Sequence, residues 1–207
     1  MLLHQPDVLQ GALELLDEDG LDGLTMRRLG ARLNVRGGAL YRHFPSKEAL
    51  LDAMAEQLLE GVADADRPHD PWPERLRFLG RHLRQKLLTR RDAARVVAGT
   101  YTSGPNTQAV GRLAFQILSD AGFKPSQAGA LHFAMFHFVL GHVIEEQAAA
   151  ALGPEHDWAA RIMKDPGYRG DLYQETLLEL AKASQEERFE YGMKVFIDGA
   201  RAQVGDL

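Results

Sequence analysis

The chain has 207 residues, of which 45% are hydrophobic and 26% are charged, and its formal net charge is −5. This is the composition of a globular protein rather than of a disordered chain. Because the sequence contains no cysteine, disulfide scaffolds, cysteine nucleophiles and thiolate metal sites are excluded.

The first 20 residues lack the basic region and the cleavable apolar segment of a secretion signal. No apolar run reaches the roughly 18–20 residues of a membrane-spanning helix, and the nearest one, residues 128–144, carries three histidines. We therefore expect a soluble, cytoplasmic protein with no membrane partner.

Hydrophobic residues recur at helical spacing along the whole chain, so we expect an all-α fold. The only fragment that favours a strand, residues 95–102, is short and ends at a Ser-Gly-Pro break. In chain order, the predicted helices cover residues 7–19, 26–33, 37–44, 46–62, 73–89, 91–100, 106–121, 125–151, either 155–164 or 171–182, and 184–203.

Helix-capping residues and prolines support the boundaries of these predicted helices. Capping side chains are predicted at four helix starts: Asp7 (with Gln10), Thr25, Ser46 and Ser184 (with Glu187). Three prolines between residues 68 and 73 indicate a linker over residues 64–72. This linker would separate a small domain, residues 1–63, from a larger helical domain, residues 73–207.

A dense basic block stands out against the acidic remainder of the chain. Residues 25–47 contain six cations and no acid: Arg27, Arg28, Arg32, Arg36, Arg42 and Lys47. Such a block can bind a polyanion locally. The alternative is a solvated helix face without a binding role.

Residues 25–44 fit a helix-turn-helix. Gly30 is small where the two helices cross, and Asn34 lies at the turn, where it tolerates a left-handed backbone conformation. The second helix, residues 37–44, would then lie in the major groove of DNA. A three-helix packing motif without a DNA-binding role is the alternative.

Four stretches carry a specific resemblance: LTMRRL at 24–29, LNV at 33–35, ALYRHF at 39–44 and SKEALL at 46–51. Together they resemble the tetracycline-repressor family of bacterial transcriptional regulators. The likeness continues through RDAARV at 91–96, AGF at 121–123 and residues 137–147.

The resemblance implies an N-terminal three-helix helix-turn-helix DNA-binding domain and a C-terminal helical ligand-binding and dimerisation domain. It implies a homodimer that binds a pseudo-palindromic, double-stranded operator and is released by a small-molecule effector. We expect a repressor, with an activator as the alternative. The resemblance leaves the operator sequence, the regulated genes and the effector open.

Carried over by position, the resemblance makes Arg27 a reader of base edges and gives Thr25, Tyr41 and Lys47 contacts to phosphates. Residues 37–39 offer only backbone groups and one methyl, so operator discrimination would depend on nearby arginines. The expected DNA-binding residues are Thr25, Arg27, Arg28, Arg36, Gly37, Gly38, Ala39, Tyr41, Arg42, His43 and Lys47.

Two predicted helices, residues 127–151 and 184–203, combine small and apolar residues. The second carries them in one stripe: Phe189, Gly192, Phe196, Gly199 and Ala200. In this family such helices form a four-helix interface between two subunits. A monomeric core would give the same spacing.

An effector cavity is expected between the helices of the larger domain. Its expected lining residues are Leu79, Leu83, Val97, Thr100, Phe115, His132, Phe133, Phe136 and His137. Because this lining is mostly apolar, we expect an uncharged or weakly polar effector, aromatic or aliphatic.

Three histidines on one predicted helix raise the question of a metal. His132, His137 and His142 are five residues apart, so successive rings point about 140° apart and do not converge on one ion. The resemblance places His137 and Glu145 at two positions that hold a magnesium–drug complex in tetracycline-responsive members. Apolar residues fill the other positions, so we expect no metal site and no cofactor, with a residual role of His137 and Glu145 left open.

The sequence disfavours two other classes of function. A small helical enzyme is disfavoured, because the sequence contains no glycine-rich phosphate loop, no HExxH and no GxSxG motif. A constitutive architectural DNA-binding protein would favour a basic body, whereas this body is acidic. We therefore predict a regulator that is not an enzyme.

Overall fold

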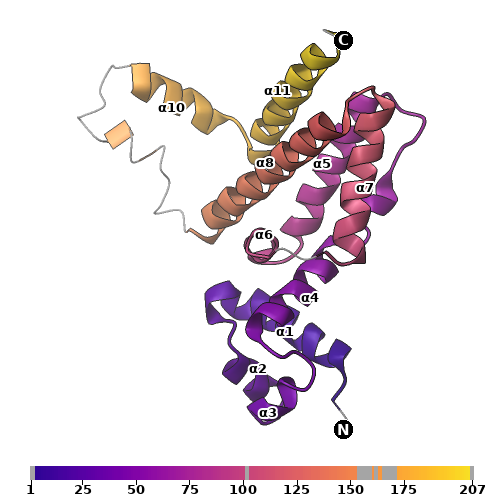
Figure 1. Ribbon diagram of the computed structural model, residues 1–207. Helices are drawn as coiled ribbons and strands as arrows, with labels where there is room; N and C mark the ends of the chain where they lie inside the picture. Colours follow the sequence, from indigo (N-terminus) through magenta and orange to yellow (C-terminus); the bar gives the residue numbers. More distant parts are fainter. Residues whose placement is uncertain (1–2, 101–102, 153–159, 161–162, 165–171, 206–207) are drawn as a thin grey trace.

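The computed structural model describes residues 3–100, 103–152, 160, 163–164 and 172–205. All regular elements in these ranges are helical, which confirms the predicted all-α fold (Figure 1). In chain order they are α1 (Gln5–Gly23), α2 (Met26–Arg32), α3 (Gly37–Leu40), α4 (Lys47–Leu59), the 3₁₀ turn η1 (Val62–Ala65), α5 (Trp72–Leu88), α6 (Ala93–Ala98), α7 (Pro105–Asp120), α8 (Pro125–Ala151), α10 (Leu172–Lys182) and α11 (Gln185–Gly205).

Helices α1 to α3 and the start of α4 form a small head, at the lower end of Figure 1. Leu16, Leu29 and Leu40 are fully buried between these helices. Asn34 has a φ of 53°, so the predicted left-handed turn between α2 and α3 is confirmed. This turn fixes the angle at which α3 leaves α2.

Most of the predicted helix caps are found. The hydroxyls of Thr25 and Ser46 each accept a backbone hydrogen bond of 3.2 Å, from Arg28 and Ala49 respectively. Ser184 and Glu187 form the predicted capping box.

The predicted start of α1 is wrong. The helix begins at Gln5 after an N-cap at His4, and Asp7 accepts from the backbone N–H of His4 at 2.9 Å. Gln10 instead donates to Glu14, one turn further on. The capping box therefore lies three residues earlier than predicted, because Asp7 takes its third helical position rather than the cap.

The recognition element is shorter than predicted. Helix α3 ends at Leu40, and residues 41–43 form a turn in which the backbone N–H of His43 bonds to the Leu40 carbonyl. Phe44 then inserts into the head core, where it is 3% exposed. This turn allows the aromatic ring to be buried before α4 begins.

Helices α5, α7 and α8 pack together as the body, with α6 lying across their lower end and α11 against α5 and α8 (Figure 1). Among the described residues, α8 is the one helix long and apolar enough to cross a membrane by length and composition. The expectation that no segment reaches this length was therefore too strict. Within the body, α8 contacts α5, α6, α7 and α11.

Residues 93–98 form α6 within the predicted helix 91–100, and their strand-favouring residues Val96 and Val97 are buried against neighbouring helices. Part of the predicted linker is held in place, since Asp66 pairs with Arg75 at 2.9 Å. The predicted helix over 155–164 lies largely outside the described residues, whereas α10 matches the alternative at 171–182.

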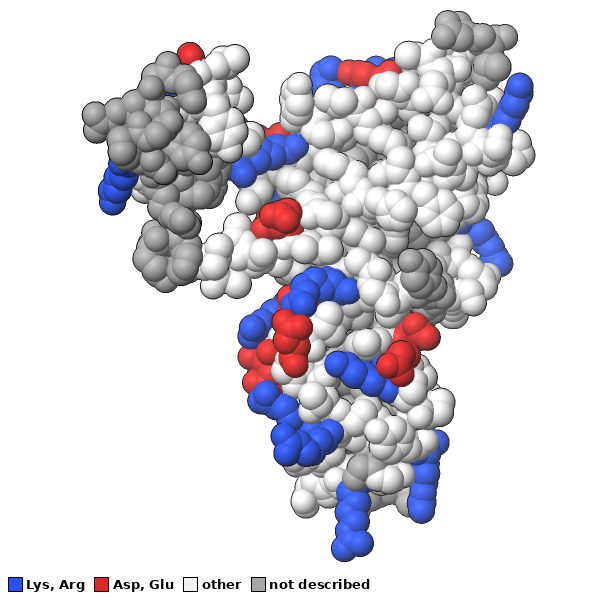
Figure 2. Space-filling view, turned by 60° about the vertical axis from the view of Figure 1, so that its left-hand side comes forward, with Lys and Arg blue, Asp and Glu red and all other residues white. Residues whose placement is uncertain are grey.

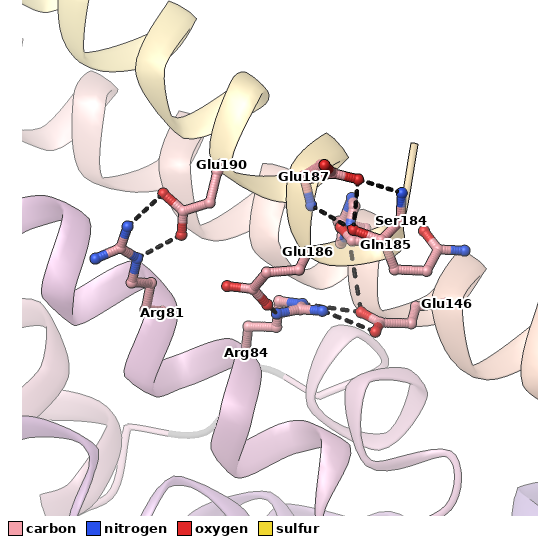
Figure 3. Close-up of polar contacts among 9 residues, drawn as sticks. Arg81, Arg84, Glu146, Ser184, Gln185, Glu186, Glu187 and Glu190 are labelled. Atoms are coloured by element: carbon pink, nitrogen blue, oxygen red, sulfur yellow. Dashed lines mark hydrogen bonds and ion pairs between the residues drawn. The ribbon is translucent and has the colours of Figure 1, made fainter. Parts of the chain in front are cut away.

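An ion-pair cluster fastens α11 to the rest of the body (Figure 3). Arg84 of α5 is 7% exposed and contacts Glu146 of α8 at 2.8 Å and Glu186 of α11. One turn earlier in α5, Arg81 binds both carboxylate oxygens of Glu190. Because a buried guanidinium is costly without partners, these contacts fix the position of the first turns of α11.

Candidate DNA-binding surface and ligand cavity

The cations of the basic block fall into two groups. Arg32 pairs with Glu14 at 2.9 Å and with Glu18 at 2.6 Å, and Arg28 pairs with Asp19. These two arginines therefore hold α2 against α1.

The other cations of the block are available to a partner. Arg27, Arg36 and Arg42 are exposed, and none of them forms an ion pair with a described residue. Positive side chains project from the free end of the head (Figure 2). A polyanion approaching this end meets guanidinium groups that the protein does not neutralise.

The remaining predicted DNA contacts come from α2, α3 and the start of α4. Tyr41 is 51% exposed, while Lys47 and His43 are half-buried. Thr25 uses an oxygen lone pair for capping and keeps its hydroxyl proton for a phosphate. Gly38 has open space around it, so backbone can approach closely there. Ala39 is half-buried, and Gly37 begins α3.

A cavity of about 730 Å³ lies in the body. Helices α6, α7 and α8 supply most of its wall, and Leu59, the last residue of α4, completes it. Its volume is within the roughly 300–1,000 Å³ of small-molecule sites. Of the predicted lining residues, the structure brings together Val97, Thr100, Phe115, His132, Phe133, Phe136 and His137.

Leu79 and Leu83, which we expected in this lining, lie elsewhere. Both belong to α5 and are at most 2% exposed. Helix α5 packs against α7, α8 and α11, so these side chains fill the core between helices and leave no surface for a ligand. The sequence could not separate them from the lining, because core positions and cavity positions share the same apolar residues at helical spacing.

Sequence reasoning also missed a polar wall formed by the start of α7. Ser103, Thr107, Gln108 and Arg112 line the cavity. The guanidinium of Arg112 donates to Gln108 Oε1 at 2.7 Å, and Gln108 Nε2 donates to the Ser103 carbonyl at 2.6 Å. Their helical spacing was the available signal, but it is equally typical of a solvated helix face.

His132 is the most buried polar group of the lining. Burial lowers its pKa to about 4, with a smaller contribution from the charge of His137. The ring centroids of Phe115, Phe133 and Phe136 lie 5.1–5.9 Å from the imidazole. His132 is therefore neutral at physiological pH, and its Nδ1 has no hydrogen-bond partner among the described residues.

Of the three histidines of α8, His132 and His137 both line the cavity, so their spacing does not separate these two as predicted. His142 contacts the Gln185 carbonyl at 3.1 Å on the α11 side, away from the cavity. Glu145 is exposed and does not line the cavity. Within the described ranges, no three His, Asp or Glu side chains come together in a way that could hold a metal ion.

Helix α4 connects the cavity to the head. Its Glu56 accepts hydrogen bonds from the backbone N–H groups of Asn106, at 2.8 Å, and Thr107, at 3.3 Å. The Asn106 side chain returns a bond to the Glu56 carbonyl at 2.8 Å. The start of α7, which forms one cavity wall, is thus tied to α4.

A second connection joins α1 to the start of α6. The carboxylate of Asp92 accepts from the backbone N–H of Leu21 at 2.8 Å. Gly20, with a φ of 74°, allows this approach, since a Cβ there would lie 2.8 Å from the same carboxylate oxygen. Arg95 pairs with Asp22 at 3.0 Å and lowers the pKa of that carboxyl. The head therefore contacts two cavity-forming helices.

Family descriptions match both parts of this architecture. Residues 8–54 match the bacterial regulatory proteins of the tetR family, and residues 65–204 match the tetracyclin repressor-like C-terminal domain. The chain belongs to the TetR family.

Individual TetR-family relatives span nearly the whole chain. The tetracycline repressor protein class A from transposon 1721 of Escherichia coli is 38% identical, over 94% of this chain and 89% of the relative. A possible TetR family transcriptional regulator from Streptomyces coelicolor A3(2) has a TM-score of 0.86 at 38% identity, covering 96% and 99% of the two chains. A TetR variant from Acinetobacter baumannii AYE, in complex with minocycline, has a TM-score of 0.75 at 32% identity, covering 97% and 98%.

In this TetR-family chain, the predicted dimer stripe of α11 is only partly free. Phe189 and Ala200 are buried within the chain, and Gly192 packs closely against the ring of Phe138. The exposed apolar surface of α11 is instead formed by Tyr191 and Val195, which are 71% and 54% exposed. The sequence pattern therefore mixed internal and external positions of the same helix.

Proposed function

We propose that this TetR-family protein is a dimeric repressor that leaves its operator when a small molecule enters the cavity. One observation carries the proposal: Leu59 of α4 lines the cavity, while the other end of α4 follows directly on the DNA-binding head. A ligand in the cavity therefore contacts the helix that packs against α1 of the DNA-binding head.

The head would bind DNA through its unpaired cations. Arg27 would read base edges, with Arg36 and Arg42 beside it, and Thr25 and Lys47 would hold phosphates. Two heads related by a two-fold axis would place their α3 helices about 34 Å apart on a pseudo-palindrome. We also propose that the protein is cytoplasmic and that it is not an enzyme.

Switching would follow from differential binding. A ligand that fits the cavity better in the DNA-free arrangement shifts the population toward it, and a hundredfold loss of operator affinity corresponds to about 2.7 kcal/mol of coupling. Movement of α6 and α7 would reach the head through Glu56 and Asp92, whose carboxylates tie the two parts together.

Tetracycline with Mg²⁺ is not the proposed effector, although relatives carry its name. The polar groups in the lining are hydroxyl, amide, imidazole and guanidinium groups. Mg²⁺ prefers carboxylate oxygens and retained water. A cavity whose described lining residues include one charged side chain, a cation, suits that metal complex poorly.

The test is an electrophoretic mobility shift with the DNA directly upstream of the protein's own gene. We expect retardation of this fragment at lower protein concentration than of a shuffled fragment, and no effect of tetracycline with Mg²⁺. Equal affinity for both fragments would reject a specific repressor. Release by micromolar tetracycline that depends on Mg²⁺ would reject the proposed effector class.

A further inference from the structure

Two chemically different walls face the cavity. Helix α8 contributes aromatic rings, with Phe133 54% exposed, and α7 adds Phe115, 41% exposed. The first two turns of α7 contribute the polar groups Thr107, Gln108 and Arg112. A ligand that satisfies both walls has a planar apolar part and one strongly polar end.

Arg112 determines which charge the polar end of a ligand should carry. Among the described lining residues it is the one charged side chain, and none of them is an aspartate or glutamate. No described residue forms an ion pair with it; its hydrogen bond is to the neutral Gln108 amide. Arg112 is itself exposed, and no carboxylate among the described lining residues compensates its charge.

The guanidinium is also held in a defined position. Gln108, itself bonded to the Ser103 carbonyl, accepts one N–H of Arg112. A guanidinium has five N–H donors in a planar fork that matches two oxygens of a carboxylate or sulfonate. Charge-assisted bonds of this type are about twice as strong as neutral ones.

The aromatic wall adds a second requirement. Phe115, Phe133 and Phe136 surround the neutral His132 ring, and none of them is fully buried. A flat ring system placed there removes this apolar surface from water. His132 supplies one hydrogen-bonding imidazole nitrogen at the same place.

We propose that the effector is an aromatic monoanion whose acidic group pairs with Arg112 and whose rings lie among Phe115, Phe133 and Phe136. The inference rests on the proposed function, because it names the ligand class of the same cavity. It replaces the sequence-based expectation of an uncharged effector, because the α7 wall adds the cation Arg112 to the lining.

Two fluorescent probes with the same ring system test the charge requirement. One is 8-anilinonaphthalene-1-sulfonate, an anion, and the other is N-phenyl-1-naphthylamine, which lacks the sulfonate and is neutral. Each is titrated into the full-length protein and its dissociation constant is measured. Val97→Trp, which fills the cavity, reports whether a probe binds there.

We expect Arg112→Ala to weaken binding of the sulfonate about tenfold and to change binding of the neutral probe less than about twofold. Arg112→Lys, which keeps the charge but loses the fork, should recover part of the affinity. Lys124→Ala removes an exposed charge outside the lining and should change neither probe. The neutral probe also shows that Arg112→Ala still folds.

Other outcomes overturn the inference. If Arg112→Ala leaves sulfonate binding unchanged, or weakens both probes equally, the cavity does not select an anion. If Val97→Trp retains full binding of the sulfonate, that probe binds outside the cavity. Neither result affects the operator shift of the wild-type protein, so failure of this inference is distinguishable from failure of the proposed function.

Discussion

The Glu56 carboxylate of α4 accepts a hydrogen bond of 2.8 Å from the backbone N–H of Asn106, in the first turn of α7. A carboxylate at this position satisfies a backbone donor that has no partner within its own helix, and it complements the positive end of the helix dipole. The contact joins the helix that leaves the DNA-binding head to the helix that carries the polar wall of the cavity.

Removing this contact should uncouple ligand binding from DNA release. We expect Glu56→Ala to bind the cavity probes normally but to lose at least about 1 kcal/mol of coupling, measured as the ratio of operator affinities without and with effector. Glu60→Ala is the control, because Glu60 is exposed directly after the end of α4 and, among the described residues, its carboxylate accepts its side-chain hydrogen bond from Gln57. Unchanged coupling in Glu56→Ala would show that the signal bypasses this bond.

The division of the basic block predicts which arginine reads DNA. Arg27→Ala should lose about 1–3 kcal/mol of operator affinity and relax the preference at one base pair, as expected for a bidentate guanine contact. Arg32→Ala should have little effect, because Arg32 already pairs with Glu14 and Glu18. Titration of a set of singly substituted operators measures both, and equal losses in the two variants would contradict the assignment.

Lys47 should act as an anchor rather than a reader. Lys47 is the first residue of α4, at the helix N-terminus where a phosphate is favoured by the helix dipole. Lys47→Ala should weaken all DNA sequences alike and reduce the slope of log affinity against log salt by about one. A change of base preference in this variant would assign it a reading role instead.

The head could be predicted well because local chemistry determines it. Asn34 tolerates the left-handed turn, and Thr25 and Ser46 cap their helices with bonds made within four residues. The length of α3 could not be predicted, since it depends on where Phe44 enters a core made by distant helices.

The apolar part of the cavity lining could be predicted from the sequence, but its polar wall could not. Apolar residues at helical spacing identify an inner face, but Leu83 and Val97 show that the pattern does not separate core from cavity. Arg112 and Gln108 were missed because polar residues on a helix are usually solvated. Their role depends on α8 lying opposite, and no local signal reports that arrangement.

The structure distinguishes two glycines of α11 that the sequence pattern placed together in the predicted dimer interface. A Cβ at Gly199 meets no atom, whereas one at Gly192 collides with the Phe138 ring. Gly199→Leu should therefore weaken the dimer at least about tenfold in sedimentation equilibrium without lowering subunit stability. Gly192→Leu should instead destabilise the fold itself. A monomeric wild-type protein at micromolar concentration would reject the interface.

Filling the cavity should separate DNA binding from induction. Val97 is 5% exposed and lines the cavity, so Val97→Trp occupies space that the effector needs. We expect operator binding to survive or to fall modestly, with induction abolished. Val97→Ala enlarges the space and should keep the response. A Val97→Trp protein that still responds fully to effector would place the ligand elsewhere.

Burial of His132 predicts a dependence of stability on pH. Its folded pKa of about 4 lies below the unfolded value of 6.5, so the unfolded chain binds the proton first as the pH falls. This contribution is complete above about pH 6.5 and is lost as the pH falls toward 4.

The free energy of unfolding, measured with urea, should therefore depend on pH in a way that requires His132. Between pH 7 and 5, the wild type should lose about 2 kcal/mol more unfolding free energy than His132→Leu. His69→Leu is the control, because that ring is exposed and keeps its water on folding. Identical pH profiles for the wild type and His132→Leu would mean that this ring is hydrated in the folded state.

Helix α4 belongs to both the DNA-binding head and the body. No junction between the two therefore leaves every contact of the body unchanged when the head is exchanged for that of another regulator. A hybrid regulator cut at the proline-rich segment after residue 64 would bring a foreign α4, and with it a foreign partner for Asn106 and a foreign cavity wall at Leu59. Operator specificity is better transplanted by replacing residues up to Ser46, where α4 begins, and keeping the body's own α4. The junction would then fall at a helix cap, and the recipient would keep its own Glu56–Asn106 contact and its own cavity wall at Leu59, while the contacts of Leu21 and Asp22 with α6 would have to be kept from the recipient.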